Sequence, residues 1–245
     1  MNLINWVDHV YVICSPEFEP ARYPKMKQLI DILKVPETHT TFACPTYKTT
    51  ITDETMNQHV KQNSVHTILR RRDGMKKSEI SLFLNFRHIL ETIRKNYTEG
   101  MFITFESDVI VLQQNMDKLE SFLSSARDSV EQWDVIDLGS NTAFSGRRNT
   151  AYNGPQSELT LFSRRDETFE IKRMLYTRCT DSLLWSYSGV VKFLDYLEKQ
   201  PFYEYPLDYY IDEFLHHHLE YRYYWSNMNF FIQTSNLGLC SSTIK

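Results

Sequence analysis

The chain has 245 residues, of which 42% are hydrophobic and 24% charged, and its formal net charge is −4. This composition is typical of a soluble globular protein, and the acidic balance argues against a general nucleic-acid binder, which is usually basic. The seven glycines form no G-x-G pair, and none precedes Lys-Ser or Lys-Thr. The two common glycine-built nucleotide sites are therefore excluded, and a bound nucleotide has to be held by side chains or a metal ion.

Targeting signals are missing from the sequence as read. Asp8 and His9 fall where a secretory signal needs an apolar stretch, and no apolar run approaches the ~18 residues of a membrane span. The four cysteines are far apart and form no C-x-x-C, which favours buried free thiols over a zinc site. We expect a cytoplasmic protein without a transmembrane segment.

Strands and helices are expected to alternate through the first half of the chain. Short β-branched or apolar runs predict strands at His9–Cys14, Thr38–Ala43, Met101–Phe105, Val109–Leu112 and Asp134–Leu138. Apolar residues at helical spacing predict helices at Arg22–Leu33, from Ser78 towards Gly100, and from Asn115 to Trp133. Residues 45–75 show no clear pattern. This alternation predicts an α/β sheet with helices on its faces.

The second half is less regular. Its pattern predicts strands at Leu159–Ser163, Phe169–Tyr176, Tyr221–Trp225 and Phe230–Thr234, and helices at Ser188–Lys199 and Leu207–Leu219. No repeat, low-complexity segment or linker divides the chain, so we expect residues 1–245 to form a single domain.

Two acids follow the buried strand at 101–105 and are the first candidate for chemistry. Glu106 and Asp108 flank Ser107, and carboxylates beside an apolar strand are unfavourable unless a cation pairs with them. At the carboxyl end of an α/β strand that cation is expected to be Mg²⁺ or Mn²⁺, with open positions for diphosphate oxygens. The alternative is an exposed turn with solvated acids.

Two further charged segments offer partners for a substrate. The basic cluster Arg70–Arg72 with Lys76 and Lys77 complements a diphosphate, or is simply a solvated loop. The stretch Glu204–Glu220 holds five acids and no Lys or Arg. Within it, Asp208 follows Pro206-Leu207 at an expected helix start, and is a candidate general base or a plain capping acid.

Asp212, one helical turn further, is the second candidate base, and Asp181, before Trp185, is the third. The run His216–His218 is expected to be structural, because successive helix positions point in different directions and cannot share one metal ion.

Several segments resemble glycosyltransferase family 25, the group of lipopolysaccharide-type and collagen-type sugar transferases. They are HVYVICSPEFEPARYPKMKQLI, KKSEISLFLNFRHILETI, MFITFESDVIV, DVIDLG and DSLLWSYSGVVKFLDYL with YPLDYYIDEFL, which together cover most of residues 9–220. The sequence departs from the family pattern at two points: Ser107 replaces the middle Asp of the Glu-Asp-Asp motif, and Asn85-Phe86 stands where Ser-His is usual.

The resemblance implies a GT-A-like fold with a mixed, mostly parallel central sheet flanked by helices. Residues 1–140 would form the nucleotide-sugar-binding half and residues 141–245 the acceptor-binding half. The implied reaction is a metal-dependent, inverting transfer from a nucleotide-diphosphate sugar, with UDP-sugars favoured, to a hydroxyl of a glycan or glycoconjugate.

The residues expected to carry this reaction fall into four groups. The metal ligands are Glu106 and Asp108; the donor contacts are Cys14, Ser15, Arg22, Arg71, Glu79 and Ser107; the acceptor contacts are Trp185, Tyr187, Ser188 and Tyr209; the catalytic candidates are Asp208, Asp212 and Asp181. Two other classes of function remain open: a catalytically silent module that binds a glycan or protein, and a nucleotidyltransferase, which would release pyrophosphate.

Overall fold

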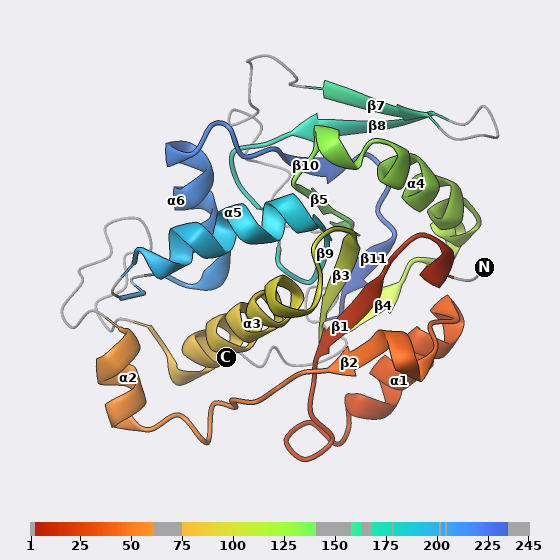
Figure 1. Ribbon diagram of the computed structural model, residues 1–245. Helices are drawn as coiled ribbons and strands as arrows, with labels where there is room; N and C mark the ends of the chain where they lie inside the picture. Colours follow the sequence, from red (N-terminus) through yellow and green to blue (C-terminus); the bar gives the residue numbers. More distant parts are fainter. Residues whose placement is uncertain are drawn as a thin grey trace.

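The fold is known from a computed structural model that describes residues 3–60, 75–140, 158–162, 168–177, 179–200, 202–203 and 205–234 (Figure 1). Arg71 and Glu204 lie outside the described residues, as do Arg70 and Arg72 of the basic cluster.

The main element is an eight-stranded sheet in the order β2-β1-β3-β9-β5-β10-β8-β7 (Figure 1). Its strands are β1 (His9–Ile13), β2 (Thr40–Phe42), β3 (Met101–Glu106), β5 (Val135–Asp137), β7 (Glu158–Phe162), β8 (Thr168–Arg173), β9 (Ser182–Ser186) and β10 (Tyr223–Ser226). The pairings set β9 and β8 antiparallel to their neighbours, so the remaining strands all run one way. The expected mixed, mostly parallel sheet is confirmed.

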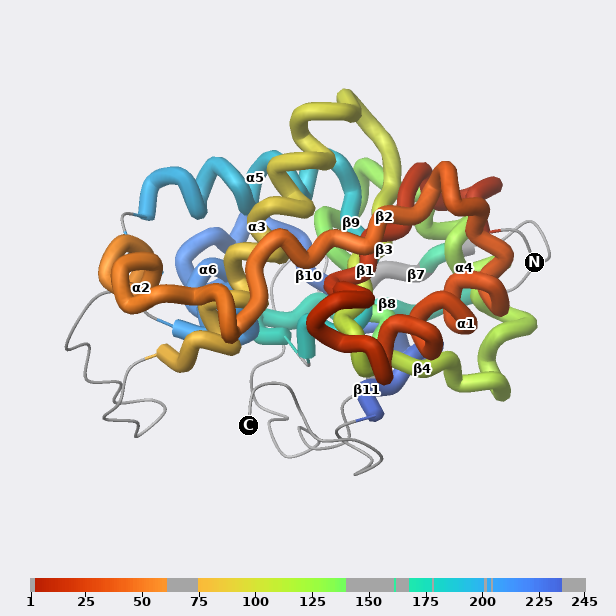
Figure 2. The backbone as a smooth tube through the Cα atoms, turned by 90° about the horizontal axis from the view of Figure 1, so that it is seen from below, coloured from red at the N-terminus to blue at the C-terminus, as the bar shows by residue number. Residues whose placement is uncertain are grey.

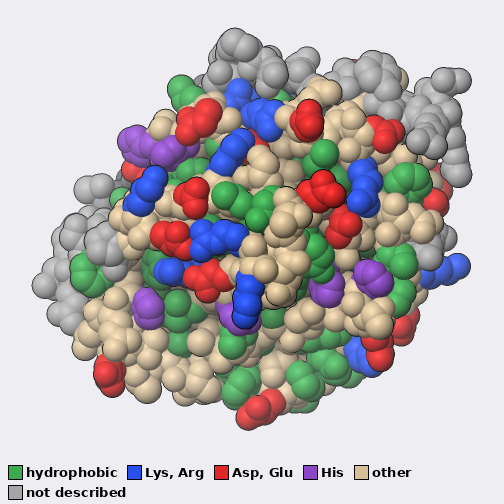
Figure 3. Space-filling model, in the orientation of Figure 1, with side chains coloured by type: hydrophobic (Ala, Val, Ile, Leu, Met, Phe, Trp, Pro, Cys, Tyr) green, Lys and Arg blue, Asp and Glu red, His purple; other side chains and the backbone are tan. Residues whose placement is uncertain are grey.

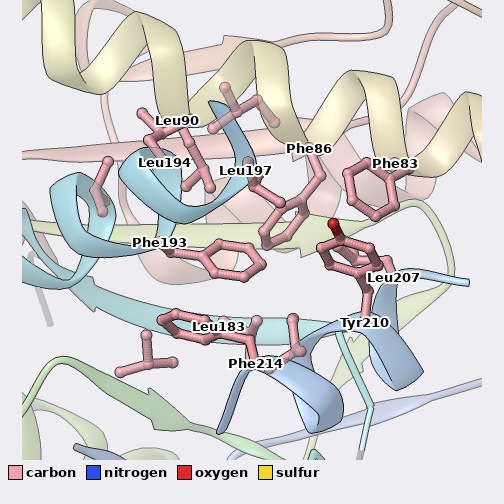
Figure 4. Close-up of a cluster of buried hydrophobic side chains, with 14 of the residues drawn as sticks. Phe83, Phe86, Leu90, Leu183, Phe193, Leu194, Leu197, Leu207, Tyr210 and Phe214 are labelled. Atoms are coloured by element: carbon pink, nitrogen blue, oxygen red, sulfur yellow. The ribbon is translucent and has the colours of Figure 1, made fainter. Parts of the chain in front are cut away.

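Helices cover both faces of this sheet. They are α1 (Tyr23–Leu33), α2 (Asp53–His59), α3 (Lys77–Asn96), α4 (Met116–Asp128), α5 (Tyr187–Glu198) and α6 (Leu207–His217). Alternation along β1 shows how the faces are divided: Tyr11 and Ile13 pack into the core shared with α3, α5 and α6, whereas Val10 and Val12 pack into the core shared with α1 and α4. The α3–α5–α6 core is rich in aromatic rings, and Phe86 from α3 and Phe193 from α5 lie over the sheet in Figure 4.

A second, three-stranded sheet contains β4 (Val109–Val111), β11 (Phe231–Gln233) and β6 (Gly139–Ser140), in that order. The apolar run after the acidic motif therefore leaves the main sheet and pairs with the last described strand.

Three elements differ from the sequence expectation. Helix α2 lies in the segment without a clear pattern, and Thr52 caps it by accepting from the Thr55 amide. Helix α3 begins at Lys77, one residue before the expected cap Ser78, because the Glu79 carboxylate accepts from the Lys76 amide at 2.8 Å. Hydrophobic periodicity alone does not reveal β9, because serines end this wholly buried strand on both sides.

Candidate functional site

Three loops meet at one edge of the main sheet, where β1, β2 and β3 end side by side. Figure 2 looks onto this edge, and the loop that follows β1 lies in its foreground. Glu106-Ser107-Asp108 follows β3 here. Because β9 is antiparallel, its first residues lie at the same edge, and the Glu106 amide donates to the Asp181 carbonyl at 2.9 Å.

Three carboxyl groups lie near Glu106. Burial, together with the nearby charges of Asp108, Asp181 and Asp208, raises the pKa of Glu106 to about 8. The Thr180 hydroxyl donates to Glu106 Oε1 at 2.6 Å and opposes this rise. The structure thus brings the two expected metal ligands together with two of the three candidate bases. We call Glu106, Asp108, Asp181 and Asp208 the acid cluster.

The backbone of Asp108 is held by the far end of the chain. Its carbonyl accepts from the Thr234 amide at 2.7 Å and from the Thr234 hydroxyl at 2.8 Å, directly after β11. Asp108 is buried, so the acidic turn is a fixed part of the interior and not a solvated loop.

Ser107 joins the acidic turn to the loop after β1. Its hydroxyl donates to Glu19 Oε1 at 2.7 Å and accepts from Arg22 Nη1 at 2.9 Å. The Arg22 guanidinium is 3.5 Å from the same Glu19 oxygen. The expected donor contacts Arg22 and Ser107 are therefore in contact with each other, and the residue between them is Glu19, which sequence reasoning missed.

A pocket opens between these loops and the first turns of α3. Its lining consists of apolar, hydroxyl, amide and charged side chains: Ile13, Glu19, Cys44, Tyr47, Lys48, Ser78, Ser81, Leu82, Asn85, Glu106 and Ser107. Glu106 belongs both to this lining and to the acid cluster, so the pocket and the cluster share a wall.

Asn85 holds one rim of the pocket. Its Oδ1 accepts from the Thr46 amide at 3.0 Å and from the Thr46 hydroxyl at 2.8 Å, and its Nδ2 donates to the Thr46 carbonyl at 2.7 Å. This buried pairing fixes the loop after β2, whose next residues, Tyr47 and Lys48, line the pocket. The Asn85-Phe86 pair is thus structural here: Asn85 holds a loop and Phe86 fills the core.

The two candidate bases on α6 have different surroundings. Asp208, a member of the acid cluster, is half-buried on the first turn of α6. Asp212 Oδ1 accepts from the Thr177 amide at 2.6 Å, a bond that ties α6 to the segment after β8. Tyr209 is half-buried on the same helix.

Gly139 allows the close approach of Asp181. A Cβ at this position would lie 2.7 Å from Asp181 Oδ1 and 2.8 Å from Ser182 Oγ. Only glycine therefore leaves room for the Asp181 carboxylate at the end of β9.

Three expected acceptor contacts lie away from the acid cluster. Trp185, Tyr187 and Ser188 stand at the other end of β9 and the start of α5, and the Tyr187 amide donates to the Gly100 carbonyl before β3. Trp185 is in the core and donates to Thr104 Oγ1 at 3.1 Å, while the Ser188 hydroxyl donates to Asp134 Oδ1 at 3.0 Å. Strand β9 runs antiparallel to β3 and β5, so its last residues lie at the edge of the sheet opposite the acid cluster.

Other donor-side candidates have varied roles. Glu79 caps α3, as described above, and is absent from the pocket lining. Cys14 is buried, which raises its pKa to about 12 and makes it a poor nucleophile. Ser15 is half-buried and accepts from the Glu17 amide at 3.2 Å.

The carboxylates of the acid cluster can be compared with the ligands that a divalent metal ion requires. Within the described ranges, no three His, Cys, Asp or Glu side chains are arranged as a ready-made metal site. Mg²⁺ is usually held by one or two carboxylates together with water and substrate phosphates, so a complete protein cage is not required. Burial and the nearby acidic charges raise the pKa of Glu106, and a divalent ion among these carboxylate oxygens would favour their charged forms, so the residues fit such an ion.

No known protein-family model matches the sequence, and a search of curated proteins finds no significant relative. Among the described helices, none is both long and apolar enough to cross a bilayer.

The residues that sequence reasoning missed carry little signal of their own. Glu17 and Glu19 stand two positions apart in one polar loop, yet Glu17 is exposed and Glu19 is buried against Ser107. Lys48, Tyr47 and Thr180 belong to loops without periodicity, and their positions depend on which strands are neighbours.

Proposed function

We propose that this protein is a glycosyltransferase of GT-A-like design, which moves a sugar from a nucleotide-diphosphate sugar to a hydroxyl of a glycan or glycoconjugate. UDP-sugars are the first donors to test. The observation that supports the proposal is the acid cluster at the carboxyl edge of the sheet, sharing Glu106 with a polar pocket. Such an edge is where α/β proteins usually bind ligands.

Asp108 and Glu106 are the residues to hold Mn²⁺ or Mg²⁺, which when bound would neutralise the charge of the leaving diphosphate. Asp108 has the more direct role, because Glu106 Oε1 already accepts from Thr180.

Asp208 is the residue to accept the proton of the acceptor hydroxyl. It lies on a different element from the acidic turn, at the helix start, where the helix dipole favours its charged form. Its charge reaches Glu106, so it stands near the acids without being part of the pocket lining. Asp181 is the second choice, as a buried carboxyl whose charge also acts on Glu106.

The test is product release by the full chain with Mn²⁺ across a panel of nucleotide sugars. A glycosyltransferase releases nucleoside diphosphate, slowly to water and faster when an acceptor is present. Release of pyrophosphate from a sugar phosphate and a nucleoside triphosphate would instead identify a nucleotidyltransferase. Binding without any release, in wild type and in Asp108→Asn alike, would leave the silent binding module as the function.

A further inference from the structure

The pocket beside the acid cluster has several polar residues that are already engaged within the protein. Asn85 is paired with Thr46, the Ser81 hydroxyl donates to the Thr46 carbonyl at 3.0 Å, and the Ser107 hydroxyl both donates and accepts. These three residues shape the wall. The lining residue that we consider for ligand binding is Glu19.

Glu19 keeps the capacity to accept more hydrogen bonds. A carboxylate offers about four lone-pair sites. The Ser107 hydroxyl and the Arg22 guanidinium, at 2.7 Å and 3.5 Å, both approach Oε1, and the Cys14 thiol adds only a weak donor. The side chain of Glu19 is 6% exposed and lines the pocket.

The charges around Glu19 favour a neutral ligand group. Arg22 balances the Glu19 charge directly, and Lys48 and Glu106 also line the pocket. A ring bearing hydroxyls satisfies such a site, because each hydroxyl donates to a carboxylate without bringing a charge of its own.

The apolar lining fits the same ligand class. Ile13 and Leu82 offer aliphatic surface, and the Tyr47 ring is held in place by stacking on Phe18, with ring centroids 4.8 Å apart and planes 3° from parallel. A sugar or ribose ring has C–H faces for these surfaces and a rim of hydroxyls for Glu19.

We infer that Glu19 is a binding residue that accepts hydrogen bonds from vicinal hydroxyls of a ring seated in this pocket. The inference rests on the proposed function for the source of the ring, which is either the ribose or the transferred sugar of the donor. Glu19 thereby makes the protein select ligands that carry the diol.

The experiment is a thermodynamic cycle measured by calorimetry on the full chain with Mn²⁺. Wild type and Glu19→Gln are titrated with UDP, 2′-deoxy-UDP, 3′-deoxy-UDP and UDP-glucose. Glu19→Gln keeps the size of the side chain but loses the charge, and we expect it to weaken UDP binding about 10-fold, as for one charge-assisted hydrogen bond. If the ribose is the partner, the loss shrinks to less than about 2-fold with a deoxy analogue, because the lost hydroxyl was the one that Glu19 bound.

The four ligands show whether the diol belongs to the ribose or to the transferred sugar. The variants separate the role of Glu19 from the proposed function. A loss seen with UDP-glucose but not with UDP assigns Glu19 to the transferred sugar. Glu17→Gln, an exposed acid two residues away, is the matched control and should change no affinity. Glu19→Asp, with melting temperatures for every variant, separates lost binding from lost folding.

Equal losses for UDP and for both deoxy analogues, together with no extra loss for UDP-glucose, would overturn the inference, since a structural role of Glu19 ignores ligand hydroxyls. Failure of wild type to bind any of the four probes would overturn it too. Sugar transfer by an enzyme whose Glu19→Gln variant binds normally would leave the proposed function intact while removing this role. Hydroxyl-dependent binding without sugar transfer would keep the role of Glu19 and contradict the proposed function.

Discussion

Among single residues, Asp108 is the one whose substitution tests the proposed metal site most directly. Asp108→Asn keeps the shape of the turn and its backbone bonds to Thr234, but removes a charge from the acid cluster. We expect metal-dependent binding of nucleoside diphosphate to be lost while the melting temperature is kept or raised, because a buried repulsion is relieved. Calorimetry with and without a chelator measures this, and unchanged chelator-sensitive affinity would contradict it.

Asp208 and Asp212 make a matched pair for the base. Asp208→Asn should lower turnover by about 10²–10⁴-fold with little change in donor affinity, as for loss of a general base. Asp212→Asn should affect stability more than turnover, since its carboxylate holds the Thr177 amide. Steady-state kinetics with circular dichroism on both variants decides the assignment. Normal turnover in Asp208→Asn would move the role to Asp181, and loss confined to Asp212→Asn would reverse the pair.

At the scale of elements, the meeting of β6 and β9 depends on a missing side chain. Gly139→Ala would put a methyl group 2.7 Å from Asp181 Oδ1, so either the Asp181 carboxylate or β6 has to move. Overpacking of this kind typically destabilises by about 1–3 kcal/mol. We expect loss of chelator-sensitive nucleotide binding together with that destabilisation. Wild-type binding and stability in this variant would show that the contact is easily relaxed.

Asp134 connects three elements at the opposite edge of the sheet. It is fully buried, and its carboxylate accepts from Lys192 of α5 at 2.8 Å and from the Arg222 amide before β10, also at 2.8 Å. Burial opposes its ionisation, but the bonds from Arg222 and Lys192 outweigh burial and lower its pKa. We therefore expect the bonds of Asp134 to Lys192 and Arg222 to stabilise the packing of α5 and β10.

Asp134→Asn should destabilise by about 1.5–3 kcal/mol, because it removes the buried charge that accepts hydrogen bonds from Lys192 and Arg222, whose side chains are 41% and 20% exposed. Asp195→Asn is the control: Asp195 is an exposed partner of Arg94 at 3.5 Å, and such pairs contribute about 0–1 kcal/mol. Urea unfolding of both variants gives the comparison, and similar losses would show that the buried network is not special.

For the whole molecule, the stability at mildly acidic pH depends partly on His9. Its ring bonds Thr41 Oγ1 at 2.8 Å and the Tyr97 hydroxyl at 3.2 Å, joining β1 to β2 and to the end of α3. Burial, with a smaller contribution from the charge of His39, lowers the pKa of His9 from 6.5 to about 4. The unfolded chain therefore binds a proton more readily than the folded protein between these two values.

Stability contributed by His9 is complete above pH 6.5 and falls as the pH drops towards 4. A pKa unit corresponds to about 1.4 kcal/mol, and because His9 is only partly buried we expect roughly 1–2 kcal/mol after solvent screening. Between pH 6.5 and 4, the free energy of unfolding of His9→Gln, measured by urea titration, should fall by roughly 1–2 kcal/mol less than that of wild type. Parallel curves for the two proteins would contradict the assignment.

The outer surface adds little to these effects. On the face drawn in Figure 3, basic and acidic side chains are interspersed. Ion pairs such as that of Arg87 with Glu91, 2.7 Å apart, lie at partly exposed helix positions. Such pairs are screened by salt, so we attribute stability to the two cores and the buried Asp134 network.

Local patterning was sufficient for much of the fold. Strands such as β1 and β3 are continuous apolar runs, and helices α1, α4 and α6 have apolar stripes at helical spacing, so each is visible in its own residues. The acidic motif was also visible, because two carboxylates directly after a buried strand require an explanation.

Tertiary structure alone decided which side chains meet. The antiparallel direction of β9 brings Asp181 to Glu106 and takes Trp185 and Tyr187 to the other edge, and no local pattern encodes the direction of a strand between two distant neighbours. The burial of Glu19 against Ser107 links positions 88 residues apart in the chain. The sequence by itself determined most of the helices and strands, because propensity and periodicity are local properties. The fold determined the pocket and the acid cluster, because strand pairing joins residues that are far apart in the chain.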